Sequence, residues 1–325
     1  MKKTIALVTG GYSGESVISY KSADSVLKNI DANKFTTYLI DIRKDGWFYK
    51  STTGNEIPID KNDFSFLENG TKIKFDAALI ILHGTPGEDG KIQGYFECIG
   101  LPYTSCDTAT SAITFNKKNT IAIAEMGGIS VAKSMQFYKS DNFSVSLIEN
   151  KLKLPLFVKP NNGGSSLGIS KVNKISDLNV AVEKAFNEDD QIIVEEFISG
   201  RELTIGVFRK KENVIALPIT EIITKNEFFD FAAKYEGASE EVTPANVEDN
   251  ITNLVNEQAI KIYKLFNCRG VVRIDFIFNQ ESNKLFLLEI NTVPGQSNAS
   301  IVPQQVVALG WTLKEFYTTL IEECF

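Results

Sequence analysis

The sequence predicts an α/β protein of two or three globular units, and three observations support this prediction. The chain has 325 residues, which is long for a single domain. Hydrophobic residues make up 43% and charged residues 23%, a balance typical of a chain with a packed core. In the first third, apolar strand-like runs alternate with segments of helical spacing, which indicates a mostly parallel sheet.

The first third supplies the strands of that sheet. An apolar strand is expected at Thr4–Thr9, and a pair of glycines turns the chain after it. Helical spacing follows over residues 15–29. Further strands are expected at Thr37–Ile42 and Ala77–Leu82, the second ending in the glycine-rich loop His83–Gly90. In such sheets the functional loops lie at the carboxyl ends of the strands.

The later two thirds mix helices, strands and glycine-rich loops, so this part is expected to be α+β. A helix is expected at Thr108–Met126, since two glycines follow it. The later elements are, in order, a strand at Leu156–Lys159, a loop at Asn161–Gly168, a helix near Leu178–Phe186, a strand at Gln191–Phe197, a polar stretch at Thr224–Val247, a helix at Ile251–Phe266, two strands and a last helix from Thr312. Glycine- and proline-rich passages suggest three units, which we place at residues 1–116, 117–202 and 203–325.

The most informative stretch is a predicted hairpin formed by Val271–Phe278 and Leu285–Asn291. Side chains two apart on a strand share a face, and directly opposed side chains lie about 4.5–5.5 Å apart at Cβ. A register centred on Ser282 predicts three facing pairs: Asp275 with Glu289, Arg273 with Asn291, and Ile277 with Leu287.

Two neighbouring carboxylates on this hairpin would repel each other unless a cation lies between them. Oxygen ligands from Asp275, Glu289 and Asn291 suit a hard cation such as Mg²⁺, with water and phosphate oxygens in its remaining positions. A solvated charged face explains the same spacing equally well, so the hairpin alone does not decide between a metal site and an ordinary surface.

Two other segments have features of a nucleotide site. Lys159 ends a strand and precedes the glycine- and serine-rich loop Asn161–Gly168, whose backbone N–H groups can close over an anion. This loop lacks the Gly-Lys-[Ser/Thr] of a P-loop, and a flexible hairpin turn is equally compatible with it. The end of the strand Gln191–Phe197 can present backbone groups to adenine, and Glu202 can bind ribose hydroxyls. On that pattern alone, an ordinary strand–loop–strand connection is favoured.

Composition excludes several other classes of function. The single histidine, His83, rules out a multi-histidine metal site and allows a Ser-His-Asp triad only through itself. Four scattered cysteines without a CxxC pair indicate reduced thiols. The net charge of −7 argues against a general nucleic-acid binder. No apolar run approaches the ~20 residues of a membrane span, and no cleavable signal is visible, so a cytoplasmic protein without a membrane partner is expected.

Taken together, the motifs resemble the ATP-grasp superfamily and, within it, the D-alanine–D-alanine ligases of bacterial cell-wall synthesis. The resemblance runs nearly end to end, through GGYSGES (10–16), HGTPGEDGKIQG (83–94), GLPYT (100–104), VKPNNGGSSLG (158–168), VEEFISGRELT (194–204), FFDFAAKYEGASEEVTPA (228–245), RIDF (273–276) and LLEINTVPGQSNASIVP (287–303). It implies an ATP-grasp fold that follows an N-terminal doubly wound domain, and ATP with two D-alanine molecules as small-molecule substrates.

The resemblance also implies roles for individual residues. For ATP, it implies phosphate contacts by Lys117 and Lys159, and adenine and ribose contacts by Glu195, Ile198 and Glu202. For the metal, it implies two Mg²⁺ ions, replaceable by Mn²⁺, on Asp275, Glu289 and Asn291. For the substrates, it implies that Glu15, which is linked through Ser165 to Tyr235, binds the ammonium of the first D-alanine, and that the carboxylate of that molecule lies near His83. It also implies that Lys234 and Ser300 bind the carboxylate of the second D-alanine. Arg273 and the Gly295 N–H would stabilise the oxyanion. A homodimer is the oligomeric state that the resemblance suggests.

Three alternatives remain open at this stage. A related ligase would use D-serine or D-lactate as second substrate, although the Lys234-Tyr235 pair resembles the dipeptide-forming branch. A dinucleotide-dependent oxidoreductase is suggested by Gly10-Gly11, but the spacing does not match GxGxxG. A silent ATP-binding regulator is disfavoured by the intact metal set. The chain also departs from the family pattern, with Gln296 where methionine is common and Glu196 where many relatives have lysine.

Overall fold

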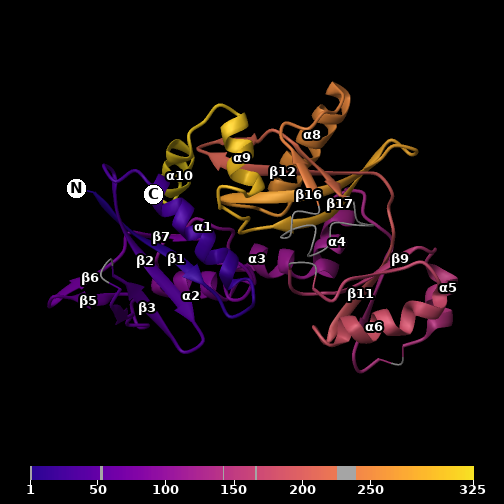
Figure 1. Cartoon of the computed structure of the whole chain (residues 1–325), viewed down its shortest axis with the longest axis horizontal. Coiled ribbons are helices and arrows are strands. Elements are labelled where there is room, and N and C mark those ends of the chain that lie inside the picture. The colour runs from indigo at the N-terminus through magenta and orange to yellow at the C-terminus, as the bar shows by residue number, and fades with distance from the viewer. Residues whose placement is uncertain (1, 52–53, 142, 165–166, 225–238) are drawn as a thin grey trace.

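The computed structural model describes residues 2–51, 54–141, 143–164, 167–224 and 239–325. Three main sheets are arranged along an elongated molecule (Figure 1). A five-stranded sheet lies at one end, a four-stranded sheet lies toward the other end, and a six-stranded sheet packs beside the latter. Strands and helices are both abundant, so the predicted α/β class is confirmed.

The N-terminal sheet has the strand order β4-β3-β2-β1-β7. Three neighbouring strands, β2, β1 and β7, are parallel, as predicted, and the antiparallel strands β3 and β4 extend the sheet beyond β2. The strands are β1 (Lys3–Gly10), β2 (Phe35–Arg43), β3 (Gly46–Lys50), β4 (Glu56–Pro58) and β7 (Ala77–Ile80), with a separate hairpin of β5 (Phe66–Glu68) and β6 (Thr71–Ile73).

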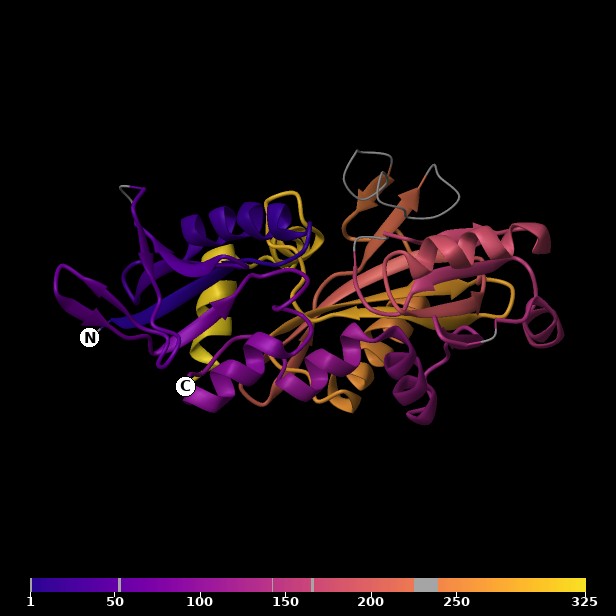
Figure 2. The same cartoon turned by 90° about the horizontal axis from the view of Figure 1, so that it is seen from below.

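Helices cover both faces of this sheet, because successive strand residues point to opposite sides. Ile5 and Leu7 of β1 pack in one core with α1 (Ser16–Asn29) and α10 (Leu313–Glu322). Ala6 and Val8 point the other way, into a core that includes α2 (Lys91–Ile99). Figure 2 shows α1 and α2 on opposite sides of the sheet. The last helix of the chain thus belongs to the core of the first sheet.

The single helix predicted over residues 108–126 is wrong in one respect, because it is two helices. α3 (Thr108–Phe115) and α4 (Lys117–Met126) are separated by Asn116, whose backbone is extended. The Asn116 side chain accepts a hydrogen bond from the N–H of Asn119 and so caps α4. The break places Lys117 in the first turn of α4, where its N–H donates to the carbonyl of Asn161 at 2.9 Å.

The four-stranded sheet is antiparallel in the order β10-β9-β11-β8. One face packs on α5 (Val145–Lys151) and α6 (Leu178–Phe186), with a short 3₁₀ turn at Ile175–Asp177. The opposite face carries Lys159 and Glu195, since both alternate with core residues of their strands. The strands are β8 (Ser134–Tyr138), β9 (Leu156–Pro160), β10 (Ser170–Val172) and β11 (Gln191–Glu196).

The six-stranded sheet carries the predicted hairpin. Its order is β15-β14-β12-β16-β17, with β13 paired to β12, and its apolar face packs on α8 (Asp249–Leu265). α9 (Ile301–Ala308) follows the hairpin. The strands are β12 (Arg201–Lys210), β13 (Asn213–Ala216), β14 (Thr220–Thr224), β15 (Ser239–Val242), β16 (Val271–Asn279) and β17 (Lys284–Asn291).

The predicted register of the hairpin holds at its functional end and fails beyond it. Arg273 faces Asn291 and Asp275 faces Glu289, as predicted. Ile277, however, faces Phe286 rather than Leu287, because a β-bulge lies between these two parts of the ladder. Asp275 pairs with Glu289 and Phe276 with Leu287, which makes Leu288 the extra residue.

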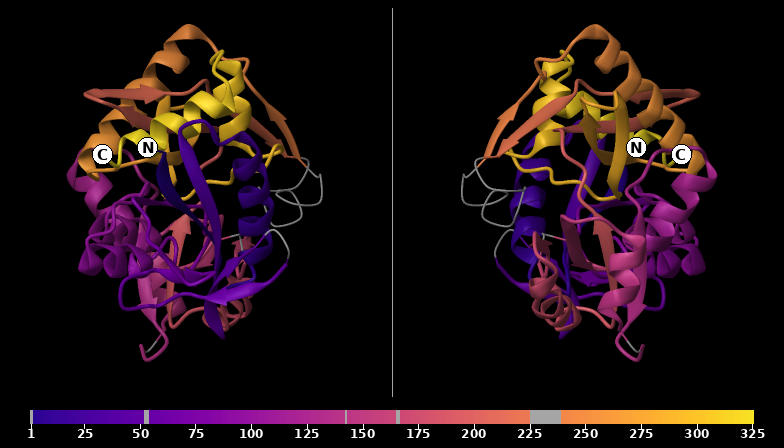
Figure 3. Two further views of the ribbon diagram at one scale, coloured as in Figure 1. Left: turned by 90° about the vertical axis from the view of Figure 1, so that its left-hand side faces the viewer. Right: turned by 90° about the vertical axis from the view of Figure 1, so that its right-hand side faces the viewer.

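The two ends of the chain lie together at the N-terminal sheet (Figure 3). The Lys3 ammonium lies 4.5 Å from the ring centroid of Phe325, and Lys34 pairs with Glu322 at 2.7 Å. The C-terminal helix therefore returns to the strand with which the chain began. Within the described residues, no helix is both long and apolar enough to cross a membrane.

Candidate active site

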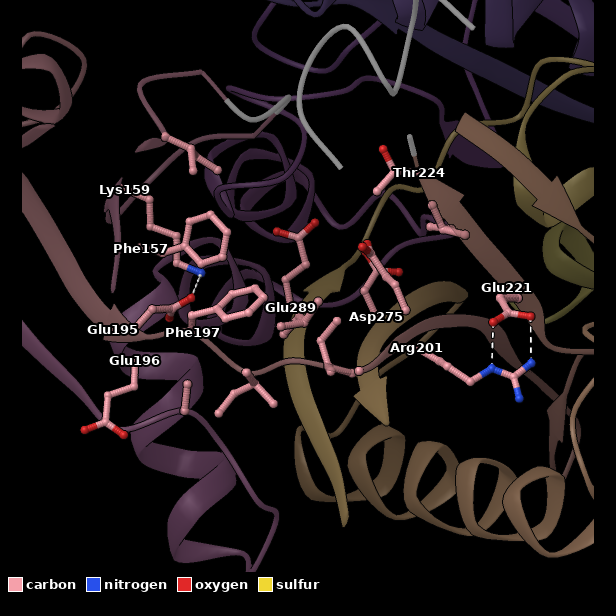
Figure 4. Close-up of a pocket in the computed structure, with 18 of the residues that line it drawn as sticks. Phe157, Lys159, Glu195, Glu196, Phe197, Arg201, Glu221, Thr224, Asp275 and Glu289 are labelled. Atoms are coloured by element: carbon pink, nitrogen blue, oxygen red, sulfur yellow. Dashed lines mark hydrogen bonds and ion pairs between the residues drawn. The ribbon is translucent and has the colours of Figure 1, made fainter. Parts of the chain in front are cut away.

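A cavity of about 390 Å³ lies between the four-stranded and the six-stranded sheets (Figure 4). One wall comes from β9 and β11, and the other from β12, β14 and the hairpin β16–β17. Four of the five residues predicted to contact ATP line this cavity: Lys159, Glu195, Ile198 and Glu202. A second cavity of about 340 Å³ adjoins it, and Glu289 lines both.

Lys159 and Glu195 form an ion pair on the wall of the first cavity, with 2.5 Å between Nζ and Oε1 (Figure 4). The side chains are only 12% and 7% exposed, so solvent screens this pair weakly. The pair results from strand alternation, since both side chains leave the sheet on the face opposite its core. It holds an ammonium group at the cavity, where the sequence predicts contact with phosphate.

The floor of the first cavity contains a second ion pair that the sequence analysis missed. Arg201 donates two hydrogen bonds of 2.7 Å to Glu221, and a third of 2.7 Å to the carbonyl of Asn246. The hydrogen bond with Glu221 raises the pKa of Arg201. The pair ties β12 to β14 beside Glu202, and the Arg201 contact with Asn246 holds the chain that leaves β15. Arg201 and Glu221 are too far apart in the sequence for a local pattern to indicate their contact, so the ion pair is visible only in the structure.

Apolar groups complete this cavity. The rings of Phe157 and Phe197 lie 5.8 Å apart at their centroids, and Leu288 enters the lining because of the bulge. An apolar lining of this kind suits a purine base. None of these three residues was predicted to line the site, because apolar residues on strands are usually core.

At the functional end of the hairpin, a buried carboxylate is surrounded by donors. Asp275 accepts hydrogen bonds from Arg273 at 2.8 and 2.9 Å and from the Asn291 amide at 3.0 Å. The Thr204 hydroxyl donates to it from the neighbouring strand. The Arg273 guanidinium also lies 4.0 Å from Glu289. Burial acts to lower the pKa of Arg273, but Asp275 and Glu289 outweigh it and raise the pKa overall.

The oxygen atoms at this end of the hairpin are suitable ligands for a hard divalent cation. Asp275 and Glu289 offer carboxylate oxygens from facing positions, and Asn291 offers an amide oxygen on the Glu289 face. Among the described residues, no group of three or more His, Cys, Asp and Glu side chains is arranged for a metal ion, so the set depends on the asparagine and on non-protein oxygens. The guanidinium between the two carboxylates confirms that this pair attracts positive charge.

The second cavity gathers the residues predicted to bind the substrates. Its lining includes Glu15, His83, Arg273, Gly295 and Ser300. Glu15 lies between two loops: a Cβ on Gly84 would collide with its carboxylate, and one on Gly164 would lie 2.7 Å from Oε1. The glycines of both loops therefore make room for this acid.

His83 is fixed by hydrogen bonds to both ring nitrogens. Nδ1 contacts the carbonyl of Val293 at 2.8 Å, and Nε2 contacts the Ser22 hydroxyl at 3.1 Å. Its backbone N–H donates to the Ser19 hydroxyl at 2.9 Å. His83 thereby joins α1 to the loop after β17. Its predicted place near the first carboxylate stays a prediction.

Gly295 and Ser300 face each other across the loop between β17 and α9. A Cβ on Gly295 would lie 2.8 Å from the Ser300 hydroxyl oxygen, so glycine is needed for this approach. That hydroxyl also accepts from the N–H of Ser297 at 3.1 Å. Lys117 lies on the opposite side of the site, where its ammonium donates to the carbonyl of Gly163 at 2.7 Å.

Three predicted residues, Ser165, Lys234 and Tyr235, lie outside the described residues, as does most of the polar stretch Thr224–Val247. The structure brings the other thirteen predicted site residues to two adjoining cavities and the phosphate-loop side between them. Their individual roles stay predictions.

Comparison with known proteins identifies the family. The family model for the D-ala D-ala ligase N-terminus matches residues 4–106, and that for the D-ala D-ala ligase C-terminus matches residues 117–322. A D-alanine--D-alanine ligase from Parabacteroides distasonis is 44% identical over 99% of this chain and 98% of its own length. The chain belongs to the D-alanine–D-alanine ligase family.

Solved structures agree with this family assignment. The VanG D-Ala:D-Ser ligase from Enterococcus faecalis has a TM-score of 0.91 and 33% identity, with all of both chains covered. The D-alanyl-alanine synthetase A from Vibrio cholerae has a TM-score of 0.89 and 26% identity over 99% of this chain and 98% of its own. The ATP-grasp fold that the sequence motifs imply is thus confirmed.

Within this family site, Glu241 is a further residue that the sequence analysis missed. It lines the second cavity from β15 and accepts a hydrogen bond of 3.3 Å from the Gln304 amide. Burial raises the pKa of this carboxyl, although Gln304 and Arg273 act against the shift. A half-buried carboxyl whose pKa is raised in a cavity that an arginine also lines is typical of a functional position.

Proposed function

We propose that this protein joins two D-alanine molecules into D-alanyl-D-alanine, with ATP as co-substrate and D-alanyl phosphate as intermediate, for peptidoglycan precursor synthesis. The observation that carries this proposal is the position of Arg273. It lies with Asp275 and Glu289 where the nucleotide cavity meets the substrate cavity. The terminal phosphate of ATP and the carboxylate of the first D-alanine would meet at that junction.

In the first step, a carboxylate oxygen of the first D-alanine attacks the terminal phosphorus of ATP, and ADP leaves. Such transfers need positioning and charge neutralisation more than covalent help from the protein. Lys159 supplies a cation in the first cavity, where Glu195 pairs with its ammonium, and Lys117 supplies one beside the loop that follows β9. Asp275, Glu289 and Asn291 would hold Mg²⁺, which supplies charge neutralisation of the phosphates when bound.

In the second step, the amine of the second D-alanine attacks the carbonyl carbon of the acyl phosphate, and phosphate leaves. Arg273 and the Gly295 N–H stabilise the oxyanion that develops. Glu15 holds the first ammonium, with Ser165 and Tyr235 linked to it. Lys234 and Ser300 hold the carboxylate of the second D-alanine, and His83 lies near the carboxylate of the first D-alanine. An enclosed site is needed because water would hydrolyse the acyl phosphate.

D-Serine as second substrate is the alternative that one solved relative raises. Eight curated relatives of 39–45% identity carry the D-alanine--D-alanine ligase name, which favours D-alanine. D-Lactate is disfavoured by the Lys234-Tyr235 pair of the sequence. We also propose a cytoplasmic homodimer without nucleic-acid or membrane partners. Light scattering coupled to gel filtration measures the oligomeric state directly.

The deciding experiment measures ADP release over a panel of D- and L-amino acids, with mass spectrometry of the products. We expect D-alanine to give the highest rate and D-alanyl-D-alanine to be the product. A product containing only D-serine or D-lactate at the second position would contradict the proposal.

The metal set is tested by the double variant Asp275→Asn, Glu289→Gln. We expect at least a 10³-fold loss of ADP release, because charge neutralisation of the phosphates contributes several kcal/mol. Glu56→Gln is the matched control, since it removes one charge from an exposed pair with Arg43 on the N-terminal sheet. Normal turnover by the double variant would show that the metals bind elsewhere.

A further inference from the structure

The loop that carries Gly295 is held by a buried amide side chain. Gln296 is only 1% exposed and sits between this loop and the C-terminal helix. Its Nε2 donates to the carbonyl of Pro294 at 3.1 Å, and its Oε1 accepts from the Tyr317 hydroxyl at 3.2 Å. Tyr317 is fully buried, and burial raises its pKa, so the phenol keeps the proton that it donates.

These two hydrogen bonds determine the direction of one peptide plane. The carbonyl of Pro294 and the N–H of Gly295 belong to the same peptide group, which is not among the cis bonds of the described chain. In a trans peptide, the C=O and N–H point in opposite directions. Because Gln296 draws the carbonyl toward the buried side, the Gly295 N–H is turned to the other side, where Gly295 lines the substrate cavity.

The same contacts determine which atom of the Gln296 side-chain amide faces the Pro294 carbonyl. A glutamine amide has one face that accepts and one that donates. Since the Tyr317 hydroxyl donates to Oε1, Nε2 is left to face the Pro294 carbonyl. Within the described residues, the Gly295 N–H itself donates to no protein acceptor. It is therefore available to a ligand.

The loop is held from a second side by α1. The backbone N–H of Gln296 donates to the Ser22 hydroxyl at 3.1 Å, and that hydroxyl contacts Nε2 of His83. Nδ1 of His83 contacts the carbonyl of Val293. Residues 293–296 thus have three fixed backbone groups, and the peptide between Pro294 and Gly295 has little freedom to rotate.

We propose that Gln296 and Tyr317 are positioning residues that aim the Gly295 N–H at the oxyanion of the ligation reaction. This inference rests on the proposed function, because it assumes that an oxyanion develops beside Gly295. A methionine at position 296 would fill space but could not donate to a carbonyl.

The test separates orientation from stability with one single variant and one double variant. Gln296→Met leaves the Pro294 carbonyl and the Tyr317 hydroxyl unpaired, whereas Gln296→Met with Tyr317→Phe leaves only the carbonyl unpaired. We expect Gln296→Met to lower kcat about tenfold, since loss of a whole oxyanion donor costs about 10²–10³. The KM for ATP should not change. The double variant should regain most of the lost melting temperature but keep the low kcat.

Binding of a tetrahedral phosphinate analogue of the dipeptide supplies a second readout. Such analogues resemble the transition state, so their affinity should fall by the same factor as kcat. Tyr263→Phe is the matched control, because it removes a buried phenol that donates 2.8 Å to the carbonyl of Gly270 away from the site. It should lower the melting temperature and leave kcat unchanged.

Three outcomes would overturn the inference. The first is a normal kcat in Gln296→Met, and the second is a kcat that returns together with the melting temperature in the double variant. In both, the wild-type protein still makes D-alanyl-D-alanine, so the proposed function stands. The third is a wild-type protein that makes no dipeptide, which removes the proposed function and this inference together.

Discussion

At the scale of single residues, two cations of the candidate site are held in ion pairs with neighbouring carboxylates. Lys159 pairs with Glu195, and Arg273 pairs with Asp275. Each pair includes side chains less than one-fifth exposed, where an unpaired charge would be costly. The ion pairs therefore fix the directions of these two cations, which under the proposed function would face the phosphate and the oxyanion.

Glu241 accepts a hydrogen bond from the neutral Gln304 amide, and it leads to a prediction of pH dependence. Its pKa in the folded protein is raised above the ordinary 4.5, first by burial. The folded state thus favours the protonated form, so stability is greatest below the unfolded pKa and declines as the pH rises through the folded pKa. Glu241→Gln keeps the shape and cannot ionise. We expect the variant to melt higher than wild type at pH 8 and equally at pH 4.

Differential scanning calorimetry at the two pH values measures this effect. Glu240→Gln, on the exposed neighbour in β15, controls for the loss of one negative charge. A gain in melting temperature that is the same at pH 4 and pH 8 would mean that ionisation of Glu241 is not its cause.

At the scale of elements, the bulge in β17 sets the division between core and cavity. Before it, Leu285 and Leu287 point into the core with Phe276 and Phe278. After it, Glu289 and Asn291 point to the site, although regular alternation from Leu287 would send them to the core. Because of the bulge, the first part of β17 faces the core with apolar side chains, and its end faces the site with polar side chains.

The bulge residue itself provides the next prediction. Leu288 lines the nucleotide cavity, so Leu288→Ala removes apolar contact that a base would make. We expect the KM for ATP to rise about tenfold, since about 1–1.5 kcal/mol of apolar contact is lost, with no change in the KM for D-alanine. Initial rates against each substrate test this. Leu67→Ala, at a leucine 62% exposed on β5, is the control. An unchanged KM for ATP would place the base elsewhere.

Much of this element-scale picture could be predicted from the sequence. The facing pairs at residues 273–275 and 289–291 follow from strand alternation and a short turn, because both signals are local. The bulge, the break at Asn116 and the Arg201–Glu221 pair could not be predicted. The ion pair joins residues distant in the sequence, and the break at Asn116 combines a local cap with the distant Asn161 carbonyl that receives the Lys117 N–H.

At the scale of the whole molecule, one core joins the two segments matched by the family models. Ile5, Leu7 and Leu79 of the first sheet share it with Phe208 and Val271 of the six-stranded sheet. The C-terminal helix lies between them and contributes Phe316, Tyr317 and Leu320. The same helix carries the hydroxyl that holds Gln296. The loop that carries Gly295 and the packing between the two matched segments therefore both depend on the C-terminal helix.

Phe316 is the residue through which this dependence is best tested. It is fully buried, and its ring lies 5.2 Å from that of Phe208 in an edge-to-face arrangement. Phe316→Ala should lower the free energy of unfolding by about 3–5 kcal/mol, because it leaves a cavity in the shared core. Urea unfolding followed by tryptophan fluorescence and by circular dichroism should still give one coincident transition, since both segments lose the same support. Val307→Ala, at a side chain 61% exposed on α9, should change neither quantity. Two separate transitions in the variant, with one at the wild-type midpoint, would show that the segments are stabilised independently.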